Sequence, residues 1–195
     1  MYTLIGGTRS RAFRVRWLLE ELDLPYDHHA TGPQSDEVKA HYPAGKIPVL
    51  LDGSTALTDS TAILTYLSDK HAALTHSAGS IERALQDGHT QFVLDEMDSL
   101  LWTAARHGFV LPEDKRVPAV KESLKWEYET SLKRLETRLG DGPFLMGDTM
   151  TIADIIAVHC LGWAIVAKFP QPEGPVSDYF NCSRKRPAYT LARSD

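Results

Sequence analysis

The sequence predicts a small mixed α/β domain followed by an all-helical domain. Residues 2–30 alternate strand, helix and strand patterns, an Asp52–Gly53 turn closes a later hairpin, and no convincing strand follows residue 80. A strand–helix–strand unit implies a parallel pair joined by a right-handed crossover, whereas a hairpin adds an antiparallel edge. The predicted order is therefore βαβ, an irregular segment and ββα, with helices afterwards.

The first βαβ unit is expected at the N-terminus. Residues 2–5 form a short apolar strand that ends at Gly6–Gly7, and the polar loop 8–11 precedes a helix of about residues 12–24. The helical spacing places one set of side chains on an apolar stripe and leaves a second set pointing away from it. The stripe contains Phe13, Trp17, Leu18 and Leu22, and the second set contains Arg14, Arg16, Glu20 and Glu21. Pro25 ends the helix, and residues 26–30 are the second strand.

The hairpin that follows carries two features suited to a ligand. Pro48 cannot donate to a strand ladder, so it belongs at a strand entrance or edge, where the neighbouring backbone is available to another chain. Asp59–Ser60 lies where a strand passes into a helix, and the exposed N–H groups there favour a carboxylate. Together these features suit an extended peptide with a free carboxylate. The alternative is that Ser60 or Asp59 only caps its helix.

The second half has helical periodicity throughout. Small and polar residues at 74–82 predict a linker between a domain of residues 1–73 and a helical domain of residues 83–195. Helices are expected at about 81–107, 120–139 and 151–168, the last apolar on most sides and hence central. Thr151 and Asp154 fit a capping box, so Asp154 is expected to have a structural rather than a catalytic role.

Composition excludes several functions. The net charge of −5 and pI near 5.9 argue against binding nucleic acid through phosphate attraction, so no nucleic-acid partner is expected. No apolar run is long enough to span a bilayer, and the N-terminus lacks the pattern of a secretion signal. Cys160 and Cys182 show no metal-ligand spacing with the histidines, so no metal is expected. Free thiols and a cytoplasmic location are favoured over a disulfide.

Several motifs in this order resemble the cytosolic glutathione transferase family over nearly the whole chain. They are the loop and helix ending in FRVRWLLEELDLPY, the segment PAGKIPVL, the Asp–Ser pair of LTDSTAILTYL, and GDTMTIADI in the helical half. The resemblance is to serine-type, bacterial-like members. It implies a thioredoxin-like N-terminal domain, an all-helical C-terminal domain and a homodimer.

The resemblance also implies a glutathione site, with glutathione as co-substrate. Ile47 would pair its backbone with the cysteinyl part of glutathione, with Pro48 in the cis form. Ser60 would hold the γ-glutamyl carboxylate, and Asp59 would lie near the α-amino end. Lys46 would pair with the glycyl carboxylate, although a solvated loop lysine is an equally good interpretation.

The same resemblance makes Ser10 the candidate catalytic residue. A hydroxyl that donates to the glutathione sulfur at a helix N-terminus favours the reactive thiolate, through the hydrogen bond and the helix dipole. Thr8 is the alternative by proximity, and the simpler interpretation is that Ser10 caps the first helix. No Tyr or Cys lies in the loop, so tyrosine-type and cysteine-type members are poor models.

The expected reaction is conjugation of glutathione to a small hydrophobic electrophile. The second substrate is expected where the two domains meet, with Trp102, Arg106 and Phe109 as its candidate contacts. Two alternatives use the same fold: a member that binds glutathione or a protein without turnover, and a glutathione-dependent isomerase or dehalogenase.

Overall fold

The computed structural model describes residues 1–194, which form two compact units. The first unit contains residues 1–78 together with the C-terminal segment from Arg184 onward. The second unit contains Gly79–Ser183. The two units are described separately below.

The first unit is built on a four-stranded sheet in the order β2-β1-β3-β4. β1 pairs in parallel with β2 and antiparallel with β3, and β3 pairs antiparallel with β4, which confirms the predicted mixed sheet. The strands are β1 (Tyr2–Ile5), β2 (Tyr26–His29), β3 (Val49–Asp52) and β4 (Thr55–Thr58). The predicted hairpin is present, but its two-residue connection is Gly53–Ser54, one residue later than the predicted Asp52–Gly53 turn, and Gly53 has φ of +60°.

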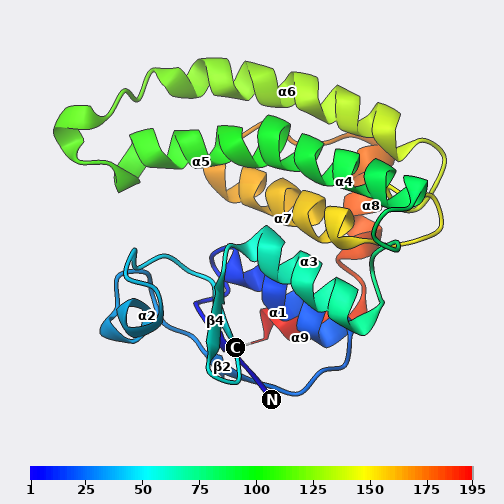
Figure 1. The fold of residues 1–195 in the computed structure, drawn as a ribbon. Coiled ribbons are helices and arrows are strands. Elements are labelled where there is room, and N and C mark those ends of the chain that lie inside the picture. The colour runs from blue at the N-terminus through cyan, green and yellow to red at the C-terminus, as the bar shows by residue number, and fades with distance from the viewer. Residues whose placement is uncertain (195) are drawn as a thin grey trace. The chain divides into compact units, whose positions relative to one another are not determined.

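Helices cover both faces of this sheet (Figure 1). On one side lie α1, α3 and α9, and on the other lies the short α2. The helices are α1 (Ala12–Glu21), α2 (Asp36–His41), α3 (Ser60–His71) and α9 (Pro187–Arg193). Because strand side chains alternate between faces, Ile5 and Val49 pack with Val38 of α2. Leu4 and Leu50, at the neighbouring positions, are buried as well.

The C-terminal helix α9 packs on α1. The ring of Tyr189 meets Phe13 and Trp17 edge-on, at centroid separations of 5.2 and 4.9 Å. Arg186 donates to both carboxylate oxygens of Glu21, at 2.6 and 2.7 Å. The predicted helical domain of residues 83–195 included this segment, whereas in the structure it belongs with the first unit. These aromatic and ionic contacts join residues far apart in the sequence, so local patterns did not indicate them.

The second unit is helical throughout its regular structure, as predicted. Its helices are α4 (Ile81–Val93), η1 (Leu94–Asp98), α5 (Ser99–Ala105), η2 (Arg106–Val110), η3 (Glu113–Lys115), α6 (Val120–Leu139), α7 (Ile152–Ala167) and α8 (Gly174–Ser183). In the segment predicted as one helix at 81–107, the π-helical turn η1 precedes α5, and a second π-helical turn, η2, follows α5 and extends past residue 107. α5 packs against both α6 and α7 (Figure 1). The bounds of α6 and α7 agree closely with the prediction.

The N-terminus of α7 confirms the predicted capping box. Asp154 is fully buried and accepts from the N–H of Thr151 at 2.8 Å and from the N–H of Leu145 at 2.9 Å. The Tyr179 hydroxyl donates to the same carboxylate at 3.0 Å. Burial raises the pKa of Asp154, and these hydrogen bonds act in the opposite direction. The carboxylate therefore ties α7 to α8 and to the preceding loop, which is a structural role.

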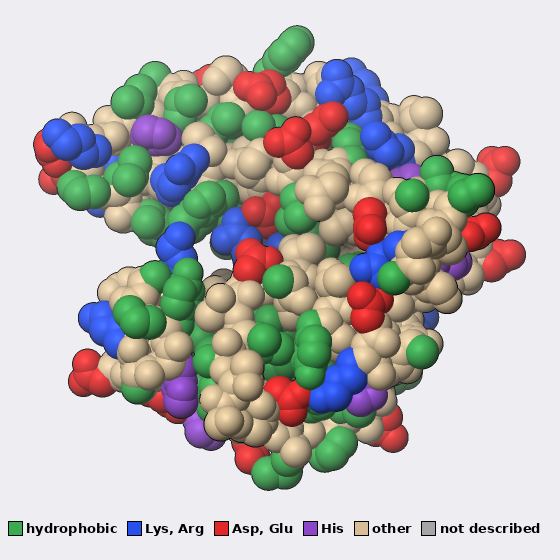
Figure 2. All heavy atoms as spheres, in the orientation of Figure 1, with side chains coloured by type: hydrophobic (Ala, Val, Ile, Leu, Met, Phe, Trp, Pro, Cys, Tyr) green, Lys and Arg blue, Asp and Glu red, His purple; other side chains and the backbone are tan. Residues whose placement is uncertain are grey.

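Several sequence expectations concern the whole chain. Within residues 1–194, no helix is both long and apolar enough to cross a membrane, and no group of three or more His, Cys, Asp or Glu residues is placed to hold a metal ion. Cys160 is buried, Cys182 is exposed, and neither forms a disulfide within residues 1–194. On the face shown in Figure 2, basic and acidic side chains are interspersed rather than segregated.

Candidate functional site

Three chain segments meet at Gly6, just past the end of β1. Gly6 is buried and has φ of +138°, a conformation that side-chain-bearing residues rarely adopt. A Cβ atom at Gly6 would lie 3.0 Å from the Cβ of Ala12 and 3.0 Å from the Cβ of Ile47. The start of α1 and the loop before β3 therefore approach each other as closely as a glycine allows. This places the Ser10 loop next to Ile47.

Ser10 makes local hydrogen bonds at the start of α1. Its hydroxyl donates to the carbonyl of Gly7 at 2.8 Å and accepts from the N–H of Ala12 at 3.1 Å. The Gly7 carbonyl also accepts from the N–H of Ser10, at 3.2 Å. The residue at the N-cap position is Arg11, which makes no side-chain capping bond. Ser10 thus satisfies part of the first turn of α1, as the simpler sequence interpretation proposed.

The Ile47–Pro48 peptide bond is cis, as the resemblance implied. Pro48 is buried, Ile47 is half-buried and Lys46 is exposed. Gln34 braces this loop: its side chain donates to the carbonyl of Ala44 at 3.0 Å, and its backbone N–H donates to the carbonyl of Gly45 at 2.8 Å. Gln34 was not among the predicted site residues. Its φ is +67°, and glutamine is not a residue type that indicates positive φ in a sequence.

Asp59 and Ser60 have different roles at the N-terminus of α3. Asp59 is the N-cap residue, and its Oδ1 accepts from the N–H groups of Thr61 and Ala62 at 2.9 and 3.0 Å. Ser60 follows as the first residue of the helix and is only 3% exposed. The N–H of Ser60 precedes the two that Asp59 caps, at the positive end of the helix dipole. Asp59 itself has φ of +69°, and such strained residues cluster at functional sites.

Arg14 was predicted to point away from the core, and that prediction was wrong. Arg14 is fully buried, and its Nη1 donates to the Ser60 hydroxyl at 3.5 Å. A sequence signal existed, because Arg14 precedes Trp17 and Leu18 by three and four residues and so shares their stripe on α1. The prediction of exposure rested on the positive charge of Arg14. Arg14 links α1 to the N-terminus of α3.

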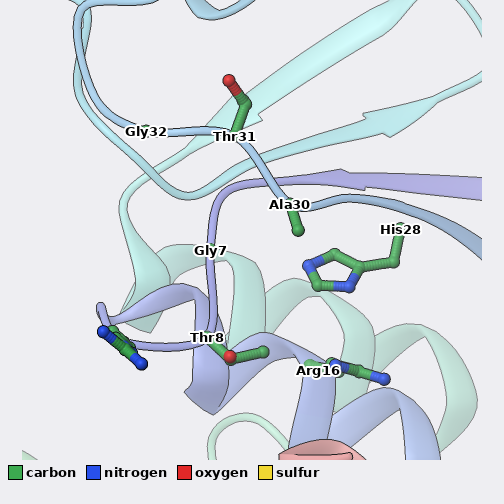
Figure 3. A pocket seen from close by; sticks show the side chains of 8 residues that line it. Gly7, Thr8, Arg16, His28, Ala30, Thr31 and Gly32 are labelled. Atoms are coloured by element: carbon green, nitrogen blue, oxygen red, sulfur yellow. The ribbon is translucent and has the colours of Figure 1, made fainter. Parts of the chain in front are cut away.

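A second feature of this unit is a shallow pocket of about 510 Å³ beside the β1–α1 loop (Figure 3). It is lined by Gly7, Thr8, Arg9, Arg16, His28, Ala30, Thr31 and Gly32. Thr8 and Arg16 lie below the ring of His28 in this view, and Ala30 points toward that ring. Arg16 donates to the Tyr26 hydroxyl at 3.1 Å, and burial followed by the bond to Glu20 raises the pKa of Tyr26. Of the predicted residues, only the alternative Thr8 lines this pocket.

The residues expected to contact the electrophile lie in the second unit. Trp102 is half-buried on α5, whereas Arg106 and Phe109 lie in η2. Phe109 is 71% exposed, and Arg106 donates to Thr103 at 2.9 Å. The backbone N–H of Arg106 donates to the carbonyl of Trp102, so the spacing between these two residues is α-helical. Their role stays a prediction.

Two family models match the chain. One, described as the N-terminal domain of glutathione S-transferase, matches residues 6–75, and the C-terminal domain model matches residues 119–189. Human hematopoietic prostaglandin D synthase is 30% identical over 82% of this chain and 77% of that protein. A putative glutathione S-transferase alpha-2 from Dictyostelium discoideum is 29% identical over 72% of this chain. The matched stretch spans 62% of the Dictyostelium protein, which is less than two thirds of its length.

Solved structures share the fold. A theta class glutathione S-transferase from Xanthomonas axonopodis pv. citri, with glutathione bound, has a TM-score of 0.82 at 24% identity and covers 100% of this chain and 97% of that one. A glutathione transferase from Phanerochaete chrysosporium, in complex with oxidized glutathione, has a TM-score of 0.80 at 25% identity over 98% of this chain and 94% of that one. These structures show the shared fold, and the two domain models with the human relative show that the chain belongs to the glutathione S-transferase family.

Proposed function

We propose that this chain conjugates the thiolate of glutathione to a small hydrophobic electrophile. The observation that carries the proposal is the meeting of the Ser10 loop, Ile47 and the N-terminus of α3 at one end of the sheet. The close approach at Gly6 brings the Ser10 loop next to Ile47, and the Arg14–Ser60 hydrogen bond joins α1 to the N-terminus of α3. The relatives of known structure with bound glutathione support the choice of ligand.

Each part of glutathione has a matching group in this arrangement. Ser60, with its N–H and its hydroxyl, receives the γ-glutamyl carboxylate at the positive end of α3. Asp59 is exposed, and both of its capping bonds use Oδ1, so Oδ2 serves the α-amino group. The backbone of Ile47 pairs with the cysteinyl unit, and the exposed Lys46 receives the glycyl carboxylate.

Ser10 is the proposed activator of the thiol. The Ala12 N–H holds Ser10 Oγ through its acceptor side, so the hydroxyl proton is able to turn without moving the oxygen. When the proton turns from the Gly7 carbonyl to the sulfur, that carbonyl keeps the Ser10 N–H. The exchange therefore leaves no buried backbone group without a partner.

The benefit of this exchange is a larger thiolate fraction. A free thiol has a pKa of about 8.5, so about 3% is ionised at pH 7. A reduction of two pKa units would ionise about three quarters of it and requires about 2.7 kcal/mol of preferential thiolate stabilisation. In the reaction the sulfur lone pair forms a bond to the electrophilic carbon, the leaving group departs with its bonding electrons, and the thiol proton passes to water.

Two observations favour other functions of the same site. The Ser10 hydroxyl donates to Gly7 rather than outward, which favours a protein that binds glutathione without turnover. The human relative is named a prostaglandin D synthase rather than a transferase. A glutathione-dependent isomerase or dehalogenase therefore remains an alternative function of this site. All three functions require glutathione to bind.

Calorimetric titration with glutathione, run beside a chlorodinitrobenzene conjugation assay on the same preparation, tests the proposal. Binding with turnover is the expected result. Binding without chlorodinitrobenzene turnover would favour the binder or the isomerase and dehalogenase alternatives, and a panel of electrophiles and halogenated substrates separates them. The absence of binding would refute the whole functional proposal.

We also propose that the chain is a cytoplasmic homodimer. Ile81 and Leu85 lie four residues apart on α4 and are 77% and 57% exposed, so they form an apolar strip suited to a second copy. Two cysteines that form no disulfide within residues 1–194 fit a reducing compartment. Light scattering should give a dimer mass for the wild type and a monomer mass for the Ile81→Glu, Leu85→Glu double variant. A monomeric wild type would refute the dimer.

A further inference from the structure

Arg14 is the only fully buried arginine among residues 1–194. A guanidinium loses much of its hydration when it is buried, and it is tolerated where hydrogen bonds compensate. One such bond goes to the Ser60 hydroxyl at 3.5 Å, across 46 positions of sequence. The position of this charge beside Ser60 therefore calls for a functional explanation.

The chemistry of the two side chains fixes the direction of the bond. A guanidinium carries only donors, whereas a serine hydroxyl carries one donor and two acceptor positions. Arg14 therefore occupies an acceptor position of Ser60 Oγ, and the hydroxyl proton must point elsewhere. Among residues 1–194 the Ser60 hydroxyl takes part in this one hydrogen bond, in which it is the acceptor. The proton is thus available to an incoming acceptor.

We propose that Arg14 is a positioning residue that presents Ser60 to the γ-glutamyl carboxylate of glutathione. The proposal rests on the proposed function, because it requires glutathione to bind at α3. Arg14 holds the Ser60 oxygen and leaves its proton for the carboxylate. Its positive charge adds to that of the helix N-terminus, where the Ser60 N–H offers a second donor. Arg14 acts through Ser60, so it should determine affinity for one end of the peptide rather than the chemistry at sulfur.

The test compares two peptides on four proteins. The peptides are glutathione and γ-aminobutyryl-cysteinyl-glycine, which lacks only the α-carboxylate of the γ-glutamyl residue. The proteins are the wild type, Arg14→Met, Ser60→Ala and the double variant. The expected result is that Arg14→Met weakens glutathione binding at least about tenfold and leaves binding of the shortened peptide unchanged. In the Ser60→Ala background the same substitution should cost much less, because the two residues act as a unit.

Two controls separate this effect from general damage. Arg134→Met removes an exposed arginine of α6 that bonds to Glu96 at 2.5 Å, and it should leave both affinities unchanged. Arg14→Lys retains a charge and donors, so it should recover part of the glutathione affinity. In the conjugation assay, Arg14→Met should raise KM for glutathione with little change in kcat.

A measurement on the wild type keeps the proposal testable if the Arg14 variants do not fold. With ¹⁵N-labelled arginine, the guanidinium protected most strongly from exchange should be that of Arg14, because of its burial. Its resonance should shift when glutathione binds and stay unmoved with the shortened peptide. Equal shifts with both peptides, no shift with bound glutathione, or an Arg14→Met variant that weakens both peptides equally would each overturn the proposal. If the wild type binds no glutathione, the proposed function itself falls, and the role of Arg14 falls with it.

Discussion

Replacing Ser10 with alanine should raise the pKa of bound glutathione thiol by about 1–2 units. A hydrogen bond to a charged group contributes about 1.5–3 kcal/mol, and each pKa unit corresponds to about 1.36 kcal/mol. At a pH below both values, the ionised fraction should fall about 10- to 100-fold. Turnover should fall less, because a more basic thiolate is a better nucleophile. The variant also loses the acceptor for the Ala12 N–H, which should cost about 1 kcal/mol of stability.

The assay is the ultraviolet difference absorbance of thiolate, recorded against pH with protein saturated in glutathione. Affinity for glutathione should change little, because Ser10 contacts only the sulfur in the proposed complex. The matched control is Thr8→Val, which removes the other hydroxyl of the loop at nearly constant shape. If Ser10→Ala leaves the thiol pKa unchanged, the assignment of Ser10 is refuted. If Thr8→Val produces the shift instead, the role belongs to Thr8.

Three further predictions concern stability. Asp154→Ala should lower the free energy of unfolding by at least about 3 kcal/mol, because buried donors lose their acceptor, and an unchanged melting temperature would contradict this. Hydrogen bonds from Lys70 and Tyr66 lower the pKa of Asp52 below 3.8, so the ionised carboxylate stabilises the folded protein at neutral pH. Asp52→Asn should therefore have a lower melting temperature than the wild type at neutral pH, and this difference should vanish as the pH falls through the lowered pKa. Gly6→Ala should destabilise the protein by about 1–3 kcal/mol through its backbone conformation, whereas Gly88→Ala, with nothing within 4 Å, should not; equal denaturation midpoints would contradict this.

The parts of the fold that were predicted are those with local signals. The turn at Gly53 and the capping box at Asp154 each depend on residues a few positions apart. The end of α1 was predicted less well, because α1 ends at Glu21 rather than directly before Pro25. The 3.6-residue period gave the bounds of α6 within a residue because a long amphipathic helix repeats its signal several times. The Ile47–Pro48 segment was identified because proline restricts its own strand position.

The parts that were missed depend on contacts between distant segments. Arg14 shares the apolar stripe of α1, but its partner Ser60 lies 46 residues away, and no pattern within α1 reveals that partner. Docking of α9 on α1 joins Tyr189 to Phe13 across the length of the chain. The π-helical turns on either side of α5 each insert a residue into a regular repeat, which a periodicity argument cannot locate.

Helix capping and ligand binding are compatible at both ends of the candidate site. The sequence analysis treated them as alternatives, yet each residue has polar groups left after its capping role. Ser10 caps with its oxygen lone pair, and its proton is able to turn toward a sulfur. Asp59 Oδ1 caps the N-terminus of α3, so Ser60 is not needed as a cap. The Ser60 N–H and hydroxyl are therefore able to bind a carboxylate. Capping also stabilises the helix ends without a ligand, so less ordering has to accompany binding. A cap at these positions is therefore evidence for a preorganised site as much as for a structural role.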